Sequence, residues 1–173
     1  MKIKELSADQ IITTNDFPVH NEHILKIFFK VFKEGYGKMI PPCPILEKKV
    51  MVSGFDEKLK KQFKEFENTH PKAEYFLLDG SHKTTAANLT GNKIKVMLFE
   101  NDKDIQEAKE LVKIGELFSL MVEDTIKKDV KEMTQHFTKK KGFQTIEEKT
   151  KKMVKEKVIP DYMIKHFKDL KLN

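Results

Sequence analysis

A short stretch in the middle of the chain constrains the fold most, because it combines a strand, a tight turn, a helix and a second strand. The apolar run Tyr75-Phe76-Leu77-Leu78 is typical of a buried strand, and Asp79-Gly80 follows it as a turn. A helix is predicted from Thr84 to Leu89, and the apolar residues of Ile94–Phe99 predict the next strand. This order is typical of an α/β fold in which a helix begins soon after a buried strand ends.

Apolar periodicity and breaker residues place the other elements. Strands are expected at Lys2–Leu6 and at Ile45–Val52, the second one after Pro41-Pro42-Cys43-Pro44. Amphipathic helices are expected at Asn21–Glu34 and Phe55–Asn68. Everything after Asp102 is expected to be helical, in segments at 104–121, 123–139, 145–157 and 161–170. We therefore predict an α/β (α+β) fold, with a small mixed sheet and flanking helices in residues 1–101, a helical insertion at 53–73, and a helical region at 102–173 packed on that domain.

The composition limits the function classes. No run approaches the roughly 18 apolar residues of a membrane-spanning helix, and the N-terminus lacks the apolar segment of a secretory signal, so we expect a cytoplasmic protein with no membrane partner. Cys43 is the single cysteine, which excludes an internal disulfide and a cysteine zinc cluster. All 33 basic residues are lysines, and the net charge is +6. Without the planar guanidinium of arginine, sequence-specific reading of DNA is disfavoured, while loose electrostatic binding to nucleic acid stays open.

The segment after the central strand brings four functional side chains to the start of a helix. The first N–H groups of a helix have no partner within it and carry partial positive charge, so they favour an anion. Gly80 lets the backbone approach closely, while His82 and Lys83 add donors. The residues predicted to bind phosphate are Gly80, Ser81, His82, Lys83, Thr84 and Thr85. Asp79 is expected to hold a Mg²⁺ ion that bridges to phosphate oxygens. The alternative is an ordinary Asp-Gly turn in which Ser81 caps the helix.

Several of these segments together resemble the ParB/sulfiredoxin superfamily. They are Pro41-Pro42-Cys43-Pro44-Ile45-Leu46, the run from Tyr75 to Lys83, Ala86-Ala87 and Gly91. The resemblance covers about residues 1 to 100. In that superfamily a Pro-led strand and a second strand precede Asp-Gly-x-His-Arg, and this loop binds nucleotide phosphates together with its helix. The resemblance therefore implies a bound nucleotide, ADP or ATP, with Lys83 in the place of the usual arginine.

Two branches of the superfamily fit the sequence less well. Sulfiredoxins place their reactive cysteine at the middle of the turn, where this sequence has Ser81, and Cys43 is expected to be a buried, inert thiol. The partition-protein branch carries a DNA-binding helix-turn-helix after this domain. Thr145-Ile146-Glu147-Glu148, followed by a helix at Asp161, is a weak candidate for that motif, and the lysine run at 139–141 is a candidate contact to a phosphate backbone.

The free serine kinases of the superfamily are more similar to this sequence. His20-Asn21-Glu22 resembles their segment before the first long helix, and residues 159–166 resemble their Pro-led C-terminal helix. The resemblance implies that Glu22 and Asp79 are catalytic, Glu22 as the base that takes the substrate hydroxyl proton. It also implies that Lys165 and His166 close over the transferred group.

The resemblance thus implies a phosphotransferase that moves phosphate between a nucleotide and a small hydroxyl metabolite such as serine, with Mg²⁺ as cofactor. One alternative is a ParB-like, nucleotide-dependent DNA-binding protein without metabolite turnover. Another is a ligand-binding module without activity. The acceptor, the choice of nucleotide and the oligomeric state stay open. Each function that involves a nucleotide requires that the amides opening the helix at Thr84 face a cavity.

Overall fold

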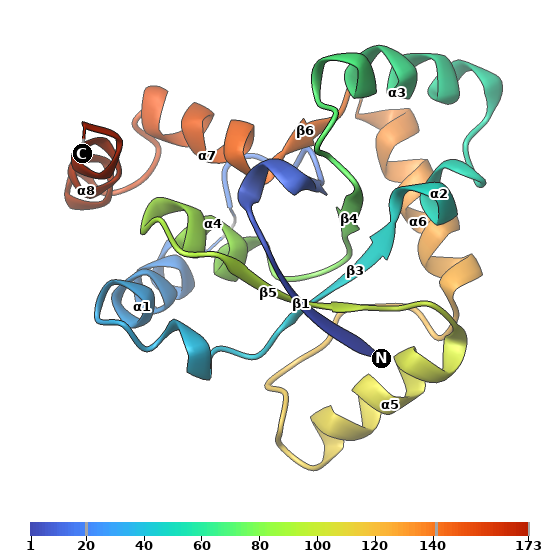
Figure 1. The fold of residues 1–173 in the computed structure, drawn as a ribbon, viewed down its shortest axis with the longest axis horizontal. Helices are drawn as coiled ribbons and strands as arrows, with labels where there is room; N and C mark the ends of the chain where they lie inside the picture. The colour runs from blue at the N-terminus through green and yellow to red at the C-terminus, as the bar shows by residue number, and fades with distance from the viewer. Residues whose placement is uncertain (20, 141, 173) are drawn as a thin grey trace.

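The protein is an α/β protein built on one open, mixed sheet of six strands. A computed structural model describes residues 1–19, 21–140 and 142–172, and these contain eight α-helices and two short 3₁₀ helices (Figure 1). The strands are β1 (Lys2–Leu6), β2 (Ile11–Thr13), β3 (Cys43–Glu47), β4 (Tyr75–Leu77), β5 (Ile94–Leu98) and β6 (Gln144–Thr145). The helices are η1 (Ala8–Gln10), α1 (Glu22–Lys33), η2 (Gly37–Met39), α2 (Lys48–Val52), α3 (Glu57–Thr69), α4 (Ser81–Leu89), α5 (Asp102–Lys113), α6 (Ile126–Lys139), α7 (Ile146–Lys155) and α8 (Asp161–Leu172).

The strand order brings the ends of β2 and β4 together. The order is β1-β5-β3-β4-β2-β6, with parallel pairs β3/β5 and β2/β4 and antiparallel pairs elsewhere. Ile12 of β2 lies opposite Phe76 of β4 on one side and Thr145 of β6 on the other. Because the carboxyl ends of parallel strands meet at the same edge of a sheet, the segments after Thr13 and after Leu77 leave the sheet side by side.

Each face of the sheet carries its own hydrophobic core. Successive residues of a strand point to opposite faces, so Ile11 and Ile45 belong to one buried cluster while Ile12 and Leu46 belong to the other. The first cluster is completed by α1, α4, α7 and α8, and the second by α2, α3, α5 and α6. Figure 1 shows the two groups of helices on opposite sides of the strands. The chain therefore forms three layers, helices over sheet over helices.

Most of the predicted elements are confirmed, with small shifts of their ends. Strands lie at Lys2–Leu6, Tyr75–Leu77 and Ile94–Leu98, as predicted. Helices α1, α3, α6, α7 and α8 lie within three residues of the helices predicted at 21–34, 55–68, 123–139, 145–157 and 161–170. The α/β class with a mixed sheet is likewise confirmed. These are the elements whose apolar periodicity extends over the whole segment, so local sequence and tertiary burial agree.

The predicted strand at Ile45–Val52 is only half right, because its second half is the short helix α2. The Lys48 N–H donates to the Glu74 carbonyl (2.8 Å), and the Lys48 ammonium pairs with Glu67 (2.7 Å) and Glu74 (2.9 Å). Met51 is fully buried in the second core cluster. These tertiary contacts stabilise a helical turn where the β-branched valines predict a strand.

The predicted helix at 104–121 is too long, because α5 ends at Lys113. Gly115 follows with φ +81°, a left-handed conformation that ends a helix and that glycine adopts without strain. The chain then crosses to α6 in an irregular loop, residues 114–125. This loop forms part of the site described below.

Two strands were not predicted at all. β2 and β6 have three and two residues, too few for an alternating pattern to be recognised. β6 lies in the region after residue 102 that was expected to be wholly helical, and it extends the sheet at the edge of β2. In the described part of the chain, no helix is both long and apolar enough to cross a membrane.

Candidate functional site

A cleft of about 400 Å³ lies at the carboxyl ends of β2 and β4, in front of the N-terminus of α4. This is where open α/β sheets usually bind ligands. The cleft has walls from four parts of the chain: the segment after β2, the turn before α4, the loop 114–125 and one face of α6. Its described lining residues are Thr13, Thr14, Asp16, Leu77, Leu78, Asp79, Gly80, Ser81, His82, Met121, Asp129, Glu132, Met133 and His136.

The helix that faces the cleft begins at Ser81, three residues earlier than predicted. Gly80 is its N-cap residue and has no side chain that could cap the first amides. Ser81 is therefore the first residue of the helix and not its cap. The Thr84 N–H donates to the Gly80 carbonyl (3.0 Å), so the prediction of anion-binding amides at Thr84 is wrong. The amides without an acceptor inside the helix belong to the turn that starts at Ser81, which lines the cleft.

Gly80 is required at this turn by both its conformation and its surroundings. Its φ is +107°, and a Cβ atom built on it would lie 2.5 Å from Cys43 Sγ. Cys43 therefore lies directly against the turn. Burial raises the pKa of the Cys43 thiol to about 11, which keeps it protonated and unreactive at neutral pH. The expectation that Cys43 is buried is confirmed, and its inertness stays a prediction.

Asp79 holds two backbone segments together at the cleft. Its Oδ1 accepts a hydrogen bond from the Gly80 N–H (2.6 Å), and its Oδ2 accepts one from the Met121 N–H (3.1 Å). The first bond shapes the turn before α4, and the second attaches the loop 114–125 to it. The negative charge of Asp79 thus lies at the cleft wall with both oxygens oriented by amides, as expected for a carboxylate that positions other groups.

One face of α6 supplies the opposite wall. Asp129, Glu132, Met133 and His136 follow one another at the spacing of a helix face, and all four line the cleft. The side chain of Asp129 is 4% exposed. Its Oδ1 accepts a hydrogen bond from the Glu123 N–H (2.9 Å), whereas its buried Oδ2 has no hydrogen-bond partner among the described residues. Burial raises the pKa of the Asp129 carboxyl to about 6.

A charged cluster closes the cleft on the β2 side. Asp16 pairs with Lys140 (3.3 Å), and His136 Nε2 accepts a hydrogen bond from the Asn15 N–H (3.0 Å). Burial lowers the pKa of His136, which favours the neutral imidazole. Lys149 is 2% exposed and donates to the Thr14 carbonyl (3.4 Å). Burial lowers the pKa of the Lys149 ammonium to about 8.

The structure places only part of the predicted phosphate-binding set in the cleft. Asp79, Gly80, Ser81 and His82 line it, and His82 Nε2 accepts a hydrogen bond from the Asn21 N–H (3.1 Å) at the start of α1. Lys83, Thr84 and Thr85 are not among the described lining residues. The Lys83 ammonium lies toward the Pro41 carbonyl (3.5 Å), and Thr84 and Thr85 are buried, the Thr84 hydroxyl donating to carbonyls of its own helix.

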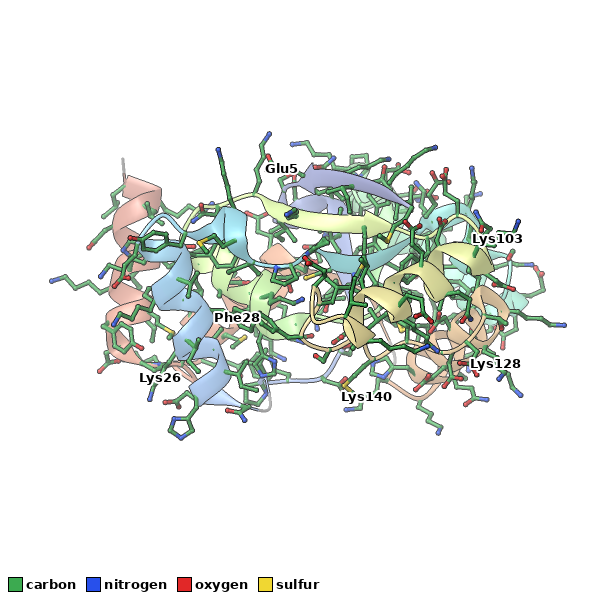
Figure 2. All side chains as sticks on the ribbon, turned by 90° about the horizontal axis from the view of Figure 1, so that it is seen from below. Glu5, Lys26, Phe28, Lys103, Lys128 and Lys140 are labelled. Atoms are coloured by element: carbon green, nitrogen blue, oxygen red, sulfur yellow. The ribbon has the colours of Figure 1, made fainter. Side chains whose placement is uncertain are left out.

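Of the residues implied by the kinase resemblance, Asp79 lines the cleft, whereas Glu22, Lys165 and His166 lie outside its described lining. Glu22 is exposed on α1 and pairs with Lys26, whose hydrogen bond lowers the pKa of the Glu22 carboxyl. Figure 2 shows Lys26 at the α1 end of the molecule, whereas Lys140 lies nearer its middle. Lys165 and His166 are on α8, where the His166 ring packs edge-on against Phe29 (5.5 Å between centroids). His20 lies outside the described residues. The catalytic role of Glu22 stays a prediction.

Sequence reasoning missed Asp16, Asp129, Glu132 and His136. One signal was present in the sequence: within 126–139, the polar residues Asp129, Glu132 and His136 share one face with Met133. That pattern also fits an ordinary solvated helix face, so it does not indicate a site without the tertiary structure.

Comparisons with known proteins do not assign the site. No family model, no curated protein and no solved structure matches this chain.

Proposed function

We propose that this protein binds the phosphate groups of a nucleotide at the start of α4 and transfers phosphate between that nucleotide and a small hydroxyl-bearing metabolite. The observation that carries the proposal is the cleft of about 400 Å³ in front of a helix N-terminus that has no side-chain cap. An oxyanion there would accept hydrogen bonds from the amides that open α4 and would interact favourably with the helix dipole. The resemblance to free serine kinases of the ParB/sulfiredoxin superfamily supports the same function.

The carboxylates around the cleft fit a magnesium ion that arrives with the nucleotide. In the described part of the chain, no three His, Cys, Asp or Glu side chains are grouped to hold a metal ion. Mg²⁺ is commonly bound through one or two carboxylates, with phosphate oxygens and waters completing its shell. Asp79 is suited to such a role, because its oxygens each retain a lone pair beyond the one that accepts an amide. The ion would neutralise charge on the phosphates.

The proposed reaction needs positioning more than covalent chemistry from the protein. The acceptor hydroxyl oxygen forms a bond to the terminal phosphorus while the bond from that phosphorus to the bridging oxygen breaks. The shortened nucleotide leaves with the electron pair of that bond, and the hydroxyl proton passes to a carboxylate of the protein. Holding the two reactants in line and placing positive dipoles near the phosphates supply most of the rate enhancement in such reactions.

Replacing Ser81 by glutamate tests the phosphate site. Glutamate at the first residue of α4 stabilises the helix through its dipole while its carboxylate competes with phosphate for the same amides. We expect binding of Mg-ADP and Mg-ATP, measured by isothermal titration calorimetry, to weaken by at least about tenfold, or ~1.4 kcal/mol. The charge-matched control Ser53→Glu, at an exposed position after α2, should leave binding unchanged. Absence of binding of both nucleotides to the wild-type protein would refute the proposal.

Asp79→Asn provides a second test of the same site. Asparagine removes the charge and leaves only one oxygen for the Gly80 and Met121 amides. We expect phosphate transfer in a nucleotide-consumption assay to be lost while the circular dichroism of the protein is unchanged. Full turnover by Asp79→Asn would remove this residue from the mechanism.

Non-specific DNA binding is the second candidate function, and a basic groove between α7 and α8 favours it. Five lysines line this groove of about 650 Å³: Lys151, Lys155, Lys157, Lys168 and Lys171. Of the lysines predicted to contact DNA, Lys140 pairs with Asp16 and Lys141 lies outside the described residues. DNA bound here should dissociate steeply with added salt and should bind less to a Lys155→Glu/Lys168→Glu variant. A lack of duplex binding at low salt would exclude this function.

A further inference from the structure

Asp129, which lines the cleft, has one carboxyl oxygen whose bonding is incomplete. Asp129 is 4% exposed, yet its Oδ2 is buried without a hydrogen-bond partner among the described residues. Its other oxygen is held by the Glu123 N–H (2.9 Å), which fixes the orientation of the carboxyl group. A buried polar atom that lacks a partner costs free energy, so native proteins retain few of them. A ligand in the cleft that donates a hydrogen bond to Oδ2 would remove this cost.

Glu132, one helical turn further along α6, has a carboxylate that is available to pair with a ligand. It is exposed, lines the cleft and takes part in no ion pair among the described residues. Of the other carboxylates, Asp16 pairs with Lys140, and Asp79 accepts two amide bonds and is assigned to the magnesium ion in the proposed function. No lysine is found in the described lining. The wall formed by α6, with Asp129 and Glu132, is therefore suited to a positively charged group and unsuited to an anionic one.

We propose that the α6 face is the binding site of the acceptor substrate, and that this substrate is a small amino alcohol. In this arrangement the ammonium group pairs with Glu132, and the hydroxyl group donates a hydrogen bond to Asp129 Oδ2. The inference rests on the proposed function for its hydroxyl acceptor, and it adds the acceptor's charge and the two residues that recognise it. A purely anionic acceptor would lie against two carboxylates without a counter-charge.

The same arrangement assigns the proton in the transfer step. As the hydroxyl oxygen bonds to the terminal phosphorus and the nucleotide leaves with its electron pair, the hydroxyl proton moves to Asp129 Oδ2. The charged groups that influence this carboxyl are Glu123 in the loop 114–125, Glu132 on α6 and Lys109 on α5. The two glutamates favour the protonated form and the lysine opposes it. The surroundings of Asp129 therefore suit a group that accepts a proton near neutral pH.

Binding of three small probes in the absence of nucleotide tests the inference directly. Ethanolamine, ethylene glycol and glycolate have similar size but carry positive, zero and negative charge. We expect NMR titrations at neutral pH to show ethanolamine binding at least about tenfold more tightly than either of the others. Glu132→Gln should remove this preference, while the matched control Glu57→Gln, on the exposed side of α3, should keep it. Asp129→Asn should weaken binding of ethanolamine with no loss of thermal stability.

The outcomes separate this inference from the proposed nucleotide site. Ser81→Glu should bind ethanolamine like the wild type while losing nucleotide binding. Equal binding of all three probes, or a Glu132→Gln variant that behaves like Glu57→Gln, would overturn the amino-alcohol site even if nucleotide binds. Ethanolamine binding in a protein that binds no nucleotide would instead refute phosphoryl transfer and keep the acceptor site.

Discussion

The contact between Gly80 and Cys43 predicts that Gly80→Ala, which adds one methyl group at the turn, lowers the free energy of unfolding by a large amount. Alanine at position 80 must hold φ near +107°, which costs a non-glycine residue about 1–2 kcal/mol. Its Cβ would also lie 2.5 Å from Cys43 Sγ and 3.2 Å from Cys43 Cβ. Overpacking of this kind typically costs about 1–3 kcal/mol. Gly80→Ala should therefore lower the free energy of unfolding by about 2–5 kcal/mol.

A double-mutant cycle separates the two causes. Cys43→Ala removes the sulfur but leaves the Cβ and the backbone of the turn unchanged, at a cost of about 1–2 kcal/mol for the lost buried atom. In the Cys43→Ala background, Gly80→Ala should cost about 1–3 kcal/mol less than in the wild type, because the clash with the sulfur is gone while the backbone strain and the close Cβ remain. Urea unfolding under reducing conditions, followed by circular dichroism, measures all four free energies.

Two results would refute this reasoning. Equal costs of Gly80→Ala in both backgrounds would show that the sulfur does not lie against the turn. A cost below about 1 kcal/mol in the wild type would show that the left-handed conformation itself is not required. Either result would also weaken the site, because the same turn positions the first amides of α4.

Two further predictions concern buried ionisable groups in and beside the cleft. The pKa of Asp129 is about 6 in the folded protein and near 3.8 in the unfolded chain. Between these pH values the folded state binds more protons than the unfolded state, so the stability of the protein falls as the pH rises from about 4 to 6. Asp129→Asn should remove this slope and gain about 2–3 kcal/mol at pH 7, measured by urea unfolding across the pH range; an unchanged slope would contradict it. The pKa of Lys149 is about 8 in the folded protein and near 10.5 when unfolded, so the folded state binds fewer protons and gains stability as pH rises through this window. Lys149→Met should stabilise the protein by about 1–3 kcal/mol at pH 7, and this gain should disappear above pH ~10.5. Destabilisation at neutral pH would show that the hydrogen bond from Lys149 to the Thr14 carbonyl contributes more than burial of the charge costs.

The sequence by itself determined the local features of the site and of the fold. The apolar run before Asp79, the Asp-Gly turn and the helix after it depend on neighbouring residues only, and so do the amphipathic helices with full apolar periodicity. Gly80 could be singled out because a turn that leads closely into a helix favours glycine. The helix start was misplaced by three residues because the backbone bond from Thr84 to Gly80 leaves no mark on the sequence.

Only the tertiary structure decided which distant residues meet at the cleft. The parallel pairing of β2 with β4 joins segments far apart in the chain, and β2 is too short to be recognised before it is paired. The face of α6 with Asp129 and Glu132 reaches the cleft because the adjacent face, with Val130 and Phe137, packs into the second core. Local propensity is fixed by each residue and its neighbours, whereas these contacts follow from packing the whole chain into one minimum of free energy.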